Sequence, residues 1–345
     1  MIAVVILNWN GAEMLRRFLP SVVEHSHPLG EVIVADNGST DESLEILQQE
    51  FPEVRTLVLD RNYGFAEGYN EAFRQLEIIA PQRYEYYLLL NSDVRVTADW
   101  LRPLHTYMEQ HPEVAAAQPK LRAEWAHDTL EYAGAAGGYI DRYGYPFCRG
   151  RLLSVVEKDG GQYDDNASIF WATGAALLIR QSDWWGVGGL DGRFFAHNEE
   201  IDLCWRLRAR GRGIVCVPQS VVYHVGGGTL PQEHPRKTYL NFRNNLTMLF
   251  KNLPDAELKH VMRVRRFLDF VAFVQFLVKG DWANAKAVRK ARRDFHQWQS
   301  DFVKDRQENL SRMVLNPIPE RVNRSLIVGF FLKGQKTFSA FMQRS

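Results

Sequence analysis

The segment 86–93 is a short apolar run that ends in three polar residues able to bind a ligand or a metal. Asn91, Ser92 and Asp93 directly follow three leucines, as expected for a central parallel strand that delivers polar side chains to a sheet edge. Open α/β sheets bind ligands just outside the carboxyl ends of their strands. A carboxylate placed there can hold a divalent metal, and the metal can neutralise a diphosphate. The alternative is an Asx turn that caps the strand.

Two earlier apolar runs end in similar polar residues. Asn8 and Asn10 follow the first run, and Asp36 and Asn37 follow the second. We expect these side chains to lie beside the polar residues 91–93, because the carboxyl ends of parallel strands meet at one edge. Such a rim suits a nucleoside, with the Asp36 carboxylate accepting hydrogen bonds from a base or a ribose. Asparagine and glycine at strand ends are also ordinary turn residues.

The segment 61–70, after the third apolar run, is rich in glycine and asparagine. Asn62, Gly64 and Asn70 are its candidate ligand-binding residues. Glycine allows a ligand to approach the backbone closely, and the start of the following helix favours anions. No GxGxxG or GxxxxGK[ST] pattern is present, which disfavours dinucleotide-binding and Walker-type sites.

Four carboxylates crowd the twelve residues 191–202, at the start of a predicted helix. Glu199, Glu200 and Asp202 are the candidate catalytic residues among them. Acidic residues in a first helical turn commonly complement the helix dipole on a solvated face. The neighbouring Phe194 and Trp205 indicate partial burial instead, which would raise a carboxyl pKa toward that of a general base.

His224 ends a short apolar run and precedes three consecutive glycines. A neutral imidazole there can complete a metal site begun by Asp93, although a lone histidine is more often structural. Glycines 226–228 suggest a mobile or phosphate-embracing loop. Arg243 lies downstream, where it either meets phosphate charge or lies on a helix surface.

The elements that must position these residues alternate between strand and helix in the first 90 residues. Apolar runs predict strands at 3–7, 32–35, 56–59 and 86–90, and helical spacing predicts helices at 12–24, 42–50 and 64–77. This order is typical of right-handed βαβ units in a mostly parallel sheet. Residues 115–161 read as loops and short strands. Regular structure returns at 169–179, in a helix at 201–210 that stops at Gly211, and in strands at 214–217 and 221–223.

The end of the chain differs in charge from the rest. From Lys259 onward there are 18 Lys/Arg against 7 Asp/Glu, although the whole chain carries a net charge of only +1. The stretch 267–279 is apolar, flanked by cations and too short to span a bilayer, which predicts an interfacial helix on anionic lipid. A second candidate is 326–333. The alternative is a helical bundle or an oligomer interface, and we expect no nucleic-acid partner.

Taken in order, these motifs resemble the family 2 glycosyltransferases of the GT-A fold, in particular the bacterial rhamnosyltransferase-like subgroup. The resemblance covers residues 1–252 and rests on the segments 6–11, 34–41, 61–70, 90–93, 199–202 and 224–229. It implies a GT-A (Rossmann-like) α/β fold, a mostly parallel central sheet flanked by helices, with a C-terminal basic helical region. The implied domains are 1–252, with a nucleotide-binding half at 1–115 and an acceptor half at 116–252, and a tail at 253–345.

The resemblance also implies a reaction: inverting transfer of a sugar from a nucleotide-diphosphate donor to a hydroxyl of a glycan or lipid-linked acceptor. Asp36 matches the base-contacting position, and Asp93 matches the last residue of the family's DxD motif, which binds Mg²⁺ or Mn²⁺. Asn91 stands where many members have aspartate. His224 matches a histidine that joins the metal or diphosphate in some relatives, and Glu200 matches the base, with Glu199 and Asp202 as fallback candidates. Apart from the resemblance, the segment from Trp171 to Gly174 and the pair Trp184 and Trp185 are candidates for an acceptor platform, because aromatic faces suit sugar rings. The alternative is that these tryptophans belong to the core.

Two other functions remain open from the residues alone. A sugar nucleotidyltransferase shares the strand-end carboxylates, and a catalytically silent module would bind a sugar nucleotide without turnover. Three cysteines without CxxC spacing favour a reducing compartment. We therefore expect a cytoplasmic protein, peripheral at the inner face of the plasma membrane, with a possible homo-oligomer.

Overall fold

The first apolar runs form neighbouring parallel strands. The computed structural model describes all residues except 227–233 and 344–345. In the main sheet, strand β1 (Ile2–Asn8) pairs in parallel with β2 (Gly30–Asp36) on one side and with β4 (Tyr86–Leu90) on the other. Strand β3 (Arg55–Val58) pairs in parallel with β2. The helices between them are α1 (Ala12–Ser26), α2 (Ser43–Glu50) and α3 (Gly64–Ile79). The predicted βαβ order is confirmed.

The second half of the sheet mixes strand directions. The full strand order is β12-β14-β6-β13-β4-β1-β2-β3. Strand β13 (Ala176–Arg180) is antiparallel to both β4 and β6 (Val114–Ala123), and β14 (Gly213–His224) is parallel to β6. The two short strands expected at 214–217 and 221–223 are one strand, β14, with a register irregularity between them. The remaining strands of this sheet are β5 (Val94–Val96), β7 (Ala126–Leu130) and β12 (Ala167–Ser168).

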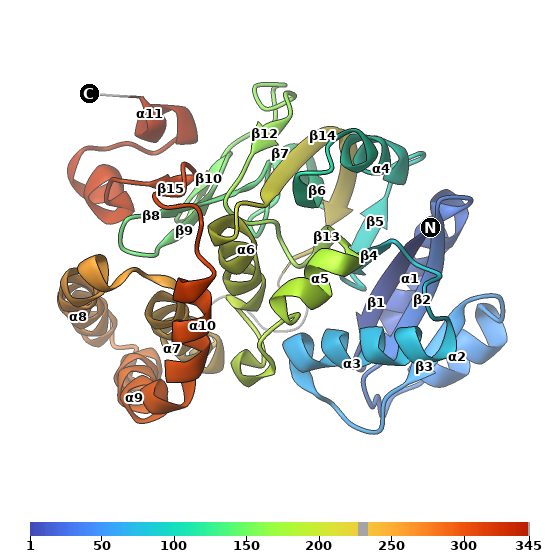
Figure 1. The fold of residues 1–345 in the computed structure, drawn as a ribbon, viewed down its shortest axis with the longest axis horizontal. Helices are drawn as coiled ribbons and strands as arrows, with labels where there is room; N and C mark the ends of the chain where they lie inside the picture. The colour runs from blue at the N-terminus through green and yellow to red at the C-terminus, as the bar shows by residue number, and fades with distance from the viewer. Residues whose placement is uncertain (227–233, 344–345) are drawn as a thin grey trace.

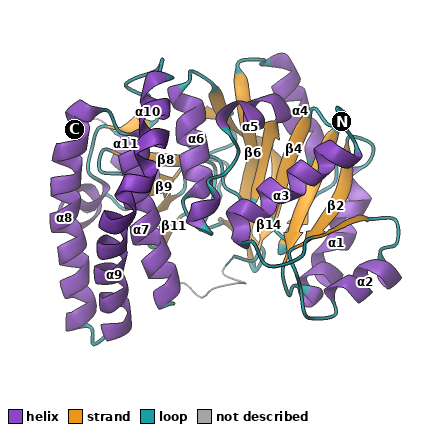
Figure 2. Cartoon of the chain, turned by 60° about the horizontal axis from the view of Figure 1, so that its bottom comes forward, coloured by secondary structure: helices purple, strands orange, loops and turns teal. Residues whose placement is uncertain are grey.

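Helices cover both faces of the main sheet, which gives the three-layer arrangement of Figures 1 and 2. Residues 2, 4 and 6 of β1 pack with α1, α2 and α4 (Leu101–Gln110), whereas residues 3 and 5 pack with α3 and α5 (Gln181–Val187). This division follows from the two-residue side-chain period of a strand. Because both faces are covered there, the central strands β1 and β4 are apolar almost throughout, as their sequence predicted.

The C-terminal region from residue 253 packs against the residues that precede it. Helix α6 (Glu199–Ala209) contacts α7 (Pro235–Asn252), and α7 packs against α9 (Trp282–Trp298) and α10 (Val303–Ser311). A second sheet of β11, β10, β9, β8 and β15 receives its last strand from this region, because β15 (Arg321–Val322) pairs with β8 (Gly138–Asp141). Its other strands are β9 (Pro146–Cys148), β10 (Arg151–Leu152) and β11 (Val155–Val156). A domain boundary at residue 252 stays a prediction.

Helix α8 (Asp255–Val278) is the longest helix that the structure describes, and α11 (Phe338–Met342) is a short one near the end of the chain. Within the described ranges, every helix is too short or too polar to cross a membrane.

Candidate active site

The polar ends of β1 and β2 hold one another in a shared network. The buried Asp36 accepts hydrogen bonds from Asn8 Nδ2 at 3.0 Å and from the backbone N–H of Ser39 at 2.9 Å. Ser39 Oγ in turn accepts from the backbone N–H of Asn10 at 2.9 Å. Strand pairing explains the proximity, because Asn8 and Asp36 are register partners. The predicted rim therefore exists, and Asp36 shapes it from inside.

A second group of amides extends this rim into the 61–64 turn. Asn37 Oδ1 accepts from the backbone N–H of Tyr63 at 2.9 Å, and Asn37 Nδ2 donates to the carbonyl of Gly64 at 3.0 Å. Asn62 Oδ1 accepts from the N–H of Gly64 at 2.8 Å. Gly64 itself has φ +77°, and a Cβ there would lie 2.5 Å from the Phe195 ring. Only glycine suits both the backbone and the space.

The end of β4 meets the end of β14 through an ion pair. Asp93 Oδ1 lies 3.1 Å from His224 Nε2, and both side chains are buried. His224 Nδ1 lies 3.3 Å from a carboxylate oxygen of Glu131, which is also buried. Burial lowers the pKa of His224, but Glu131 and Asp93 outweigh it and raise the pKa to about 10. Burial likewise opposes ionisation of Asp93, yet the hydrogen bond from His224 brings its pKa below the usual value. Asn91 Nδ2 lies 3.3 Å from His224 Nε2.

Glu199 and Glu200 open helix α6, and neither forms an ion pair with any residue that the structure describes. One carboxylate oxygen of each is buried and accepts no hydrogen bond within the described part of the chain. Burial raises the pKa of Glu200 to about 7, and it raises that of Glu199 well above its usual value, with a further contribution from the Glu200 charge. Glu199 is buried, whereas Glu200 is partly exposed. Glu200 is thus the carboxylate that a substrate can reach.

The loop before these glutamates is strained. Phe195, His197 and Asn198 have φ values of 66°, 72° and 68°, in the left-handed region that non-glycine residues seldom adopt. Asn244 of α7 holds this loop, because its Nδ2 lies within hydrogen-bond distance of the carbonyls of Phe194, Ala196 and His197, at 3.0, 2.8 and 2.8 Å. Strain that the surrounding structure maintains is common at functional sites.

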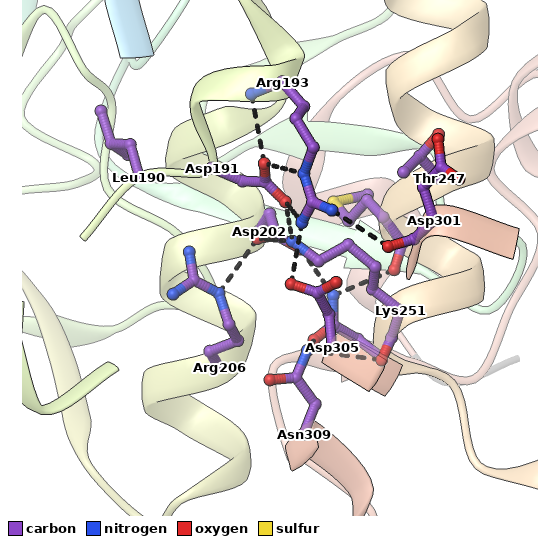
Figure 3. Close-up of polar contacts among 12 residues, drawn as sticks. Leu190, Asp191, Arg193, Asp202, Arg206, Thr247, Lys251, Asp301, Asp305 and Asn309 are labelled. Carbon is purple, nitrogen blue, oxygen red and sulfur yellow. Dashed lines mark hydrogen bonds and ion pairs between the residues drawn. The ribbon is translucent and has the colours of Figure 1, made fainter. Parts of the chain in front are cut away.

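A buried ionic cluster fixes the same loop from behind (Figure 3). Lys251 Nζ lies 2.7 Å from Asp191 and 2.8 Å from Asp202, joining the loop, α6 and α7. Arg193 lies 2.7 Å from Asp191 and 2.8 Å from Asp305 of α10. Burial opposes ionisation of Asp191, but Arg193 and Lys251 hold its pKa well below the usual range. The C-terminal helices therefore position the loop 191–198 that precedes Glu199 and Glu200.

The two ends of the site lie close together because β13 starts at the edge where β4 ends. The N–H of Asn91 donates to the carbonyl of Ala175 at 3.0 Å. A Cβ added to the adjacent Gly174 would lie 3.9 Å from Glu200 Cβ and 2.9 Å from the Phe65 ring. The antiparallel strand thus brings the Glu200 loop next to the strand end that carries Asp93.

Residues 3–176 match the profile described as "Glycosyl transferase family 2". The chain belongs to this family. It is 28% identical over 233 residues to the "N-acetylglucosaminyl-diphospho-decaprenol L-rhamnosyltransferase" of Mycobacterium tuberculosis, covering 64% of this chain and 75% of that protein. It is 27% identical over 194 residues to "Rhamnosyltransferase WbbL" of Escherichia coli K12, covering 55% and 70%.

Solved glycosyltransferase structures share the fold. "GalNAc-T7 with UDP, GalNAc and Mn2+" superposes with a TM-score of 0.57 at 15% identity, over 92% of this chain and 58% of that one. Staphylococcus aureus TarS 1–349 with UDP-GlcNAc gives 0.54 at 14% identity, over 90% and 88%. These similarities establish a GT-A-like fold with a C-terminal helical region.

Several residues predicted for the family 2 site lie elsewhere. Trp171 is only 3% exposed, and its indole N–H donates to the Tyr139 carbonyl at 2.8 Å, so it offers no open face to an acceptor. Arg243 is buried, donates to the Phe194 carbonyl at 3.1 Å and stacks on Trp298, so it supports the loop and does not face a phosphate.

Two more of these predictions need correction. Asn70 is buried, and its Nδ2 donates to the Leu190 carbonyl at 2.7 Å, which links α3 to the start of the loop that precedes Glu199. Asp202 is fully buried and bound by Arg206, Lys251 and Asn252, so it cannot act as a base.

The first N–H groups of α3 are also occupied. Those of Phe65 and Ala66 donate to the Phe195 carbonyl at 2.8 and 3.2 Å, which leaves them unable to bind an anion. Gly227, Gly228 and Thr229 of the predicted loop lie outside the described residues.

No pattern in the sequence pointed to Glu131 or Asn244 as parts of the site. Glu131 lies in the segment that looked like irregular loops, and Asn244 lies on a helix with no motif around it. No sequence motif surrounds either residue, because each contributes through a contact with a distant segment: Glu131 with His224, and Asn244 with Phe194.

Proposed function

We propose that this glycosyltransferase moves a sugar from a nucleotide-diphosphate donor to an acceptor hydroxyl with inversion of configuration. The observation that carries the proposal is the position of Glu200: buried enough for a pKa of about 7, without a cationic partner among the described residues, and next to the strand end that carries Asp93. A base with a pKa near the working pH accepts a proton well and is substantially ionised beforehand.

The donor nucleoside would lie along the rim formed by the ends of β1 and β2. Asn10 and Asn62 are exposed there, while Asn8, Asp36 and Asn37 hold the rim in shape from beneath. Ser92 lies at the adjoining end of β4, where Asn91 and Asp93 would face the diphosphate. The rim thus orients the donor so that its sugar points toward Gly174 and Glu200.

Asp93 and His224 are the residues that would hold a divalent cation. Within the described residues no cluster of three or more His, Cys, Asp and Glu side chains is arranged to bind a metal unaided. His224 must first lose its proton to bind a cation. The Asp93 carboxylate and the neutral imidazole, 3.1 Å apart, would then fit a cation such as Mn²⁺ or Mg²⁺ that also binds the donor diphosphate. When bound, such a cation stabilises negative charge on the leaving diphosphate. Glu131 would orient the imidazole from its far side.

Glu200 then removes the proton of the acceptor hydroxyl as that oxygen attacks the anomeric carbon. The new C–O bond forms as the bond to the diphosphate oxygen breaks, and a single displacement inverts the anomeric centre. The ionic cluster around Lys251 and the clamp by Asn244 keep Glu200 in place, because small displacements of a reacting group lower the rate strongly.

The names of the relatives suggest the substrates to test. We propose L-rhamnose as the transferred sugar and a lipid-linked glycan diphosphate as the acceptor, in cell-surface polysaccharide synthesis, because two relatives are named as rhamnosyltransferases.

The test begins with a panel of nucleotide-diphosphate sugars, screened for thermal stabilisation with and without Mn²⁺. Donors that stabilise the protein are then offered with lipid-linked acceptors, and the anomeric configuration of the product is determined by NMR. Stabilisation by one donor class and a product of inverted configuration are expected. Retained configuration would refute a single displacement, and nucleotidyl transfer would refute the function itself.

A further inference from the structure

Helix α8 carries an apolar face that no described part of the chain covers. Phe267, Phe270, Val271, Val274 and Val278 are 64, 59, 47, 38 and 84% exposed. At 100° per residue these positions, spaced i, i+3, i+4, i+7 and i+11, fall within one narrow stripe along the helix. We call this set the α8 stripe. Trp282, 63% exposed, continues the apolar surface at the first residue of α9.

The opposite side of α8 already anchors the helix to the protein. Val261, Arg265 and Asp269 are its buried residues. Arg265 donates to the Tyr143 carbonyl at 3.0 Å, and Asp269 is bound by Arg265 and by Arg292 of α9. The α8 stripe is therefore not needed to hold the helix against the protein, since contacts on the other face do so. A continuous apolar surface of this kind marks an interaction site.

The charges beside the stripe select the partner. Lys259, Arg263, Arg266 and Lys279 are exposed on α8, at both ends of the stripe. Between Leu258 and Lys279 the only acidic residue is the buried, paired Asp269. Exposed cations with no acid among them favour a negatively charged partner surface over a neutral or positively charged one.

The outer face of α9 repeats this pattern. Lys286, Arg289 and Arg293 are exposed and recur with Trp282 at helical spacing, opposite the buried Ala287, Ala291 and Phe295. Arg293 pairs with Asp294 of its own helix. Helices α8 and α9 stand side by side at the margin of the molecule, away from the main sheet (Figures 1 and 2).

We propose that the α8 stripe and Trp282 lie in the interface of an anionic lipid bilayer, with the cations of α8 and α9 at the headgroups. The combination of an apolar helical stripe, a terminal tryptophan and flanking Lys/Arg is what binds a helix flat on such a surface. A second copy of the chain fits less well. Both parallel and antiparallel pairing of two α8 stripes would bring arginines and lysines against one another with no acid between them.

The arrangement also suits the proposed reaction, although it does not depend on it. The turn between α8 and α9 lies at the same end of the molecule as the start of α7 and the end of β14 (Figure 2). The end of β14 carries His224. Attachment through this end would hold the candidate site near the headgroups, where a lipid-linked hydroxyl would arrive.

The second sequence candidate, 326–333, contributes less. Leu326 and Phe330 are buried in the core, whereas Val328, Phe331 and Leu332 are 40, 61 and 79% exposed. These three residues lie within five positions, against twelve for the α8 stripe, so we assign the membrane contact to α8.

The experiment measures sedimentation of the full chain with phosphatidylcholine vesicles, with and without phosphatidylglycerol. The test variant is Phe267→Ser/Phe270→Ser/Val274→Ser, and the matched control is Ile78→Ser/Ile79→Ser, two exposed apolar residues at the end of α3. A third variant, Arg263→Gln/Arg266→Gln, tests the charges. Circular dichroism melts check that each variant folds.

The wild type and the control should bind only vesicles that contain phosphatidylglycerol, and less tightly at high salt. The triple variant and the charge variant should each bind roughly tenfold or more weakly. Equal binding by the triple variant, or no binding by the wild type, would overturn the proposal. So would a wild-type dimer in sedimentation velocity that the triple variant converts to a monomer, because the stripe would then be a subunit interface.

Donor hydrolysis in the absence of vesicles separates the two proposals. All three variants should hydrolyse the donor at the wild-type rate, since none touches the site. If the wild type shows no hydrolysis, the proposed function fails while the vesicle result stands.

Discussion

Replacing Glu200 with glutamine should abolish transfer and stabilise the protein at the same time. The substitution keeps the size of the side chain and removes only its ability to ionise. Glu200 has no cationic partner among the described residues, and burial raises its pKa to about 7. An ionised Glu200 is therefore useful for chemistry and unfavourable for folding.

The size of the stability effect follows from the pKa. A carboxyl whose pKa is raised from 4.5 to about 7 on folding favours the folded state below pH 4.5. This advantage is lost as the pH rises through 7. The difference corresponds to about 3 kcal/mol at pH 8, at about 1.4 kcal/mol per pKa unit. For a chain of 345 residues this equals a shift in Tm of about 4 °C.

The assay compares Tm and transfer rate of wild type and Glu200→Gln from pH 5 to pH 8. The variant should melt about 4 °C higher at pH 8, with the gap closing toward pH 5. The wild-type rate should rise with pH through about 7 as the base ionises, and kcat of the variant should fall by about 10²–10⁴-fold. Donor binding by calorimetry should be unchanged. Glu53→Gln, at an exposed glutamate, is the control.

A gap in Tm that does not depend on pH would refute the raised pKa. Unchanged turnover would place the base elsewhere, with Glu199 the next residue to test because one oxygen of its carboxylate also accepts no hydrogen bond from the described residues.

Three further predictions concern the rest of the site. Asp93→Asn should remove the stabilisation by Mn²⁺ plus donor in a thermal-shift assay, since the remaining imidazole is a single ligand; undiminished stabilisation would place the cation elsewhere. Asp36→Asn should weaken nucleoside diphosphate binding about tenfold. Each carboxylate oxygen of Asp36 accepts one hydrogen bond, whereas asparagine has a single acceptor oxygen, so one of the two bonds would be lost and the rim would rearrange. Unchanged affinity by calorimetry would contradict this. Asn244→Ala should cost about 1–3 kcal/mol in urea unfolding and shift the pH–rate profile, because the carbonyls of the strained loop lose their donor; the exposed Asn323→Ala should change neither.

The helices and strands of the first half could be read from the sequence because their signals are local. The apolar run that became β1 is followed by an amphipathic helix and by a second run, and parallel pairing of such runs is the common outcome. Once the strands are parallel, Asn8, Asp36 and Asp93 must come to one edge, as the structure has them. Covering both faces with helices is then required to bury the apolar strands.

The predicted positions of some side chains were wrong where the sequence allowed two environments, one in the core and one at the site. The sequence allows Trp171 to lie either under a bound sugar or in the core. In the structure it lies in the core, where its indole N–H donates to the Tyr139 carbonyl. Arg243 lies on a helix whose buried face could not be identified from its pattern, and it turned inward onto Trp298. Asp202 and Glu200 are two residues apart in an acidic cluster, yet only Asp202 received cationic partners.

The sequence by itself determined the parallel strands β1 to β4, their polar ends and the family, since each depends on residue order and short-range periodicity. Tertiary structure decided which carboxylate remains free to act as a base, which amides hold the strained loop, and which face of α8 stays bare. Those outcomes depend on desolvation and on partners from distant segments: Lys251 neutralises Asp202, Glu131 meets His224, and the ion pairs of Asp269 hold α8 with its apolar stripe outward. A pKa or an exposed face is a property of the surroundings, and only the folded chain supplies them.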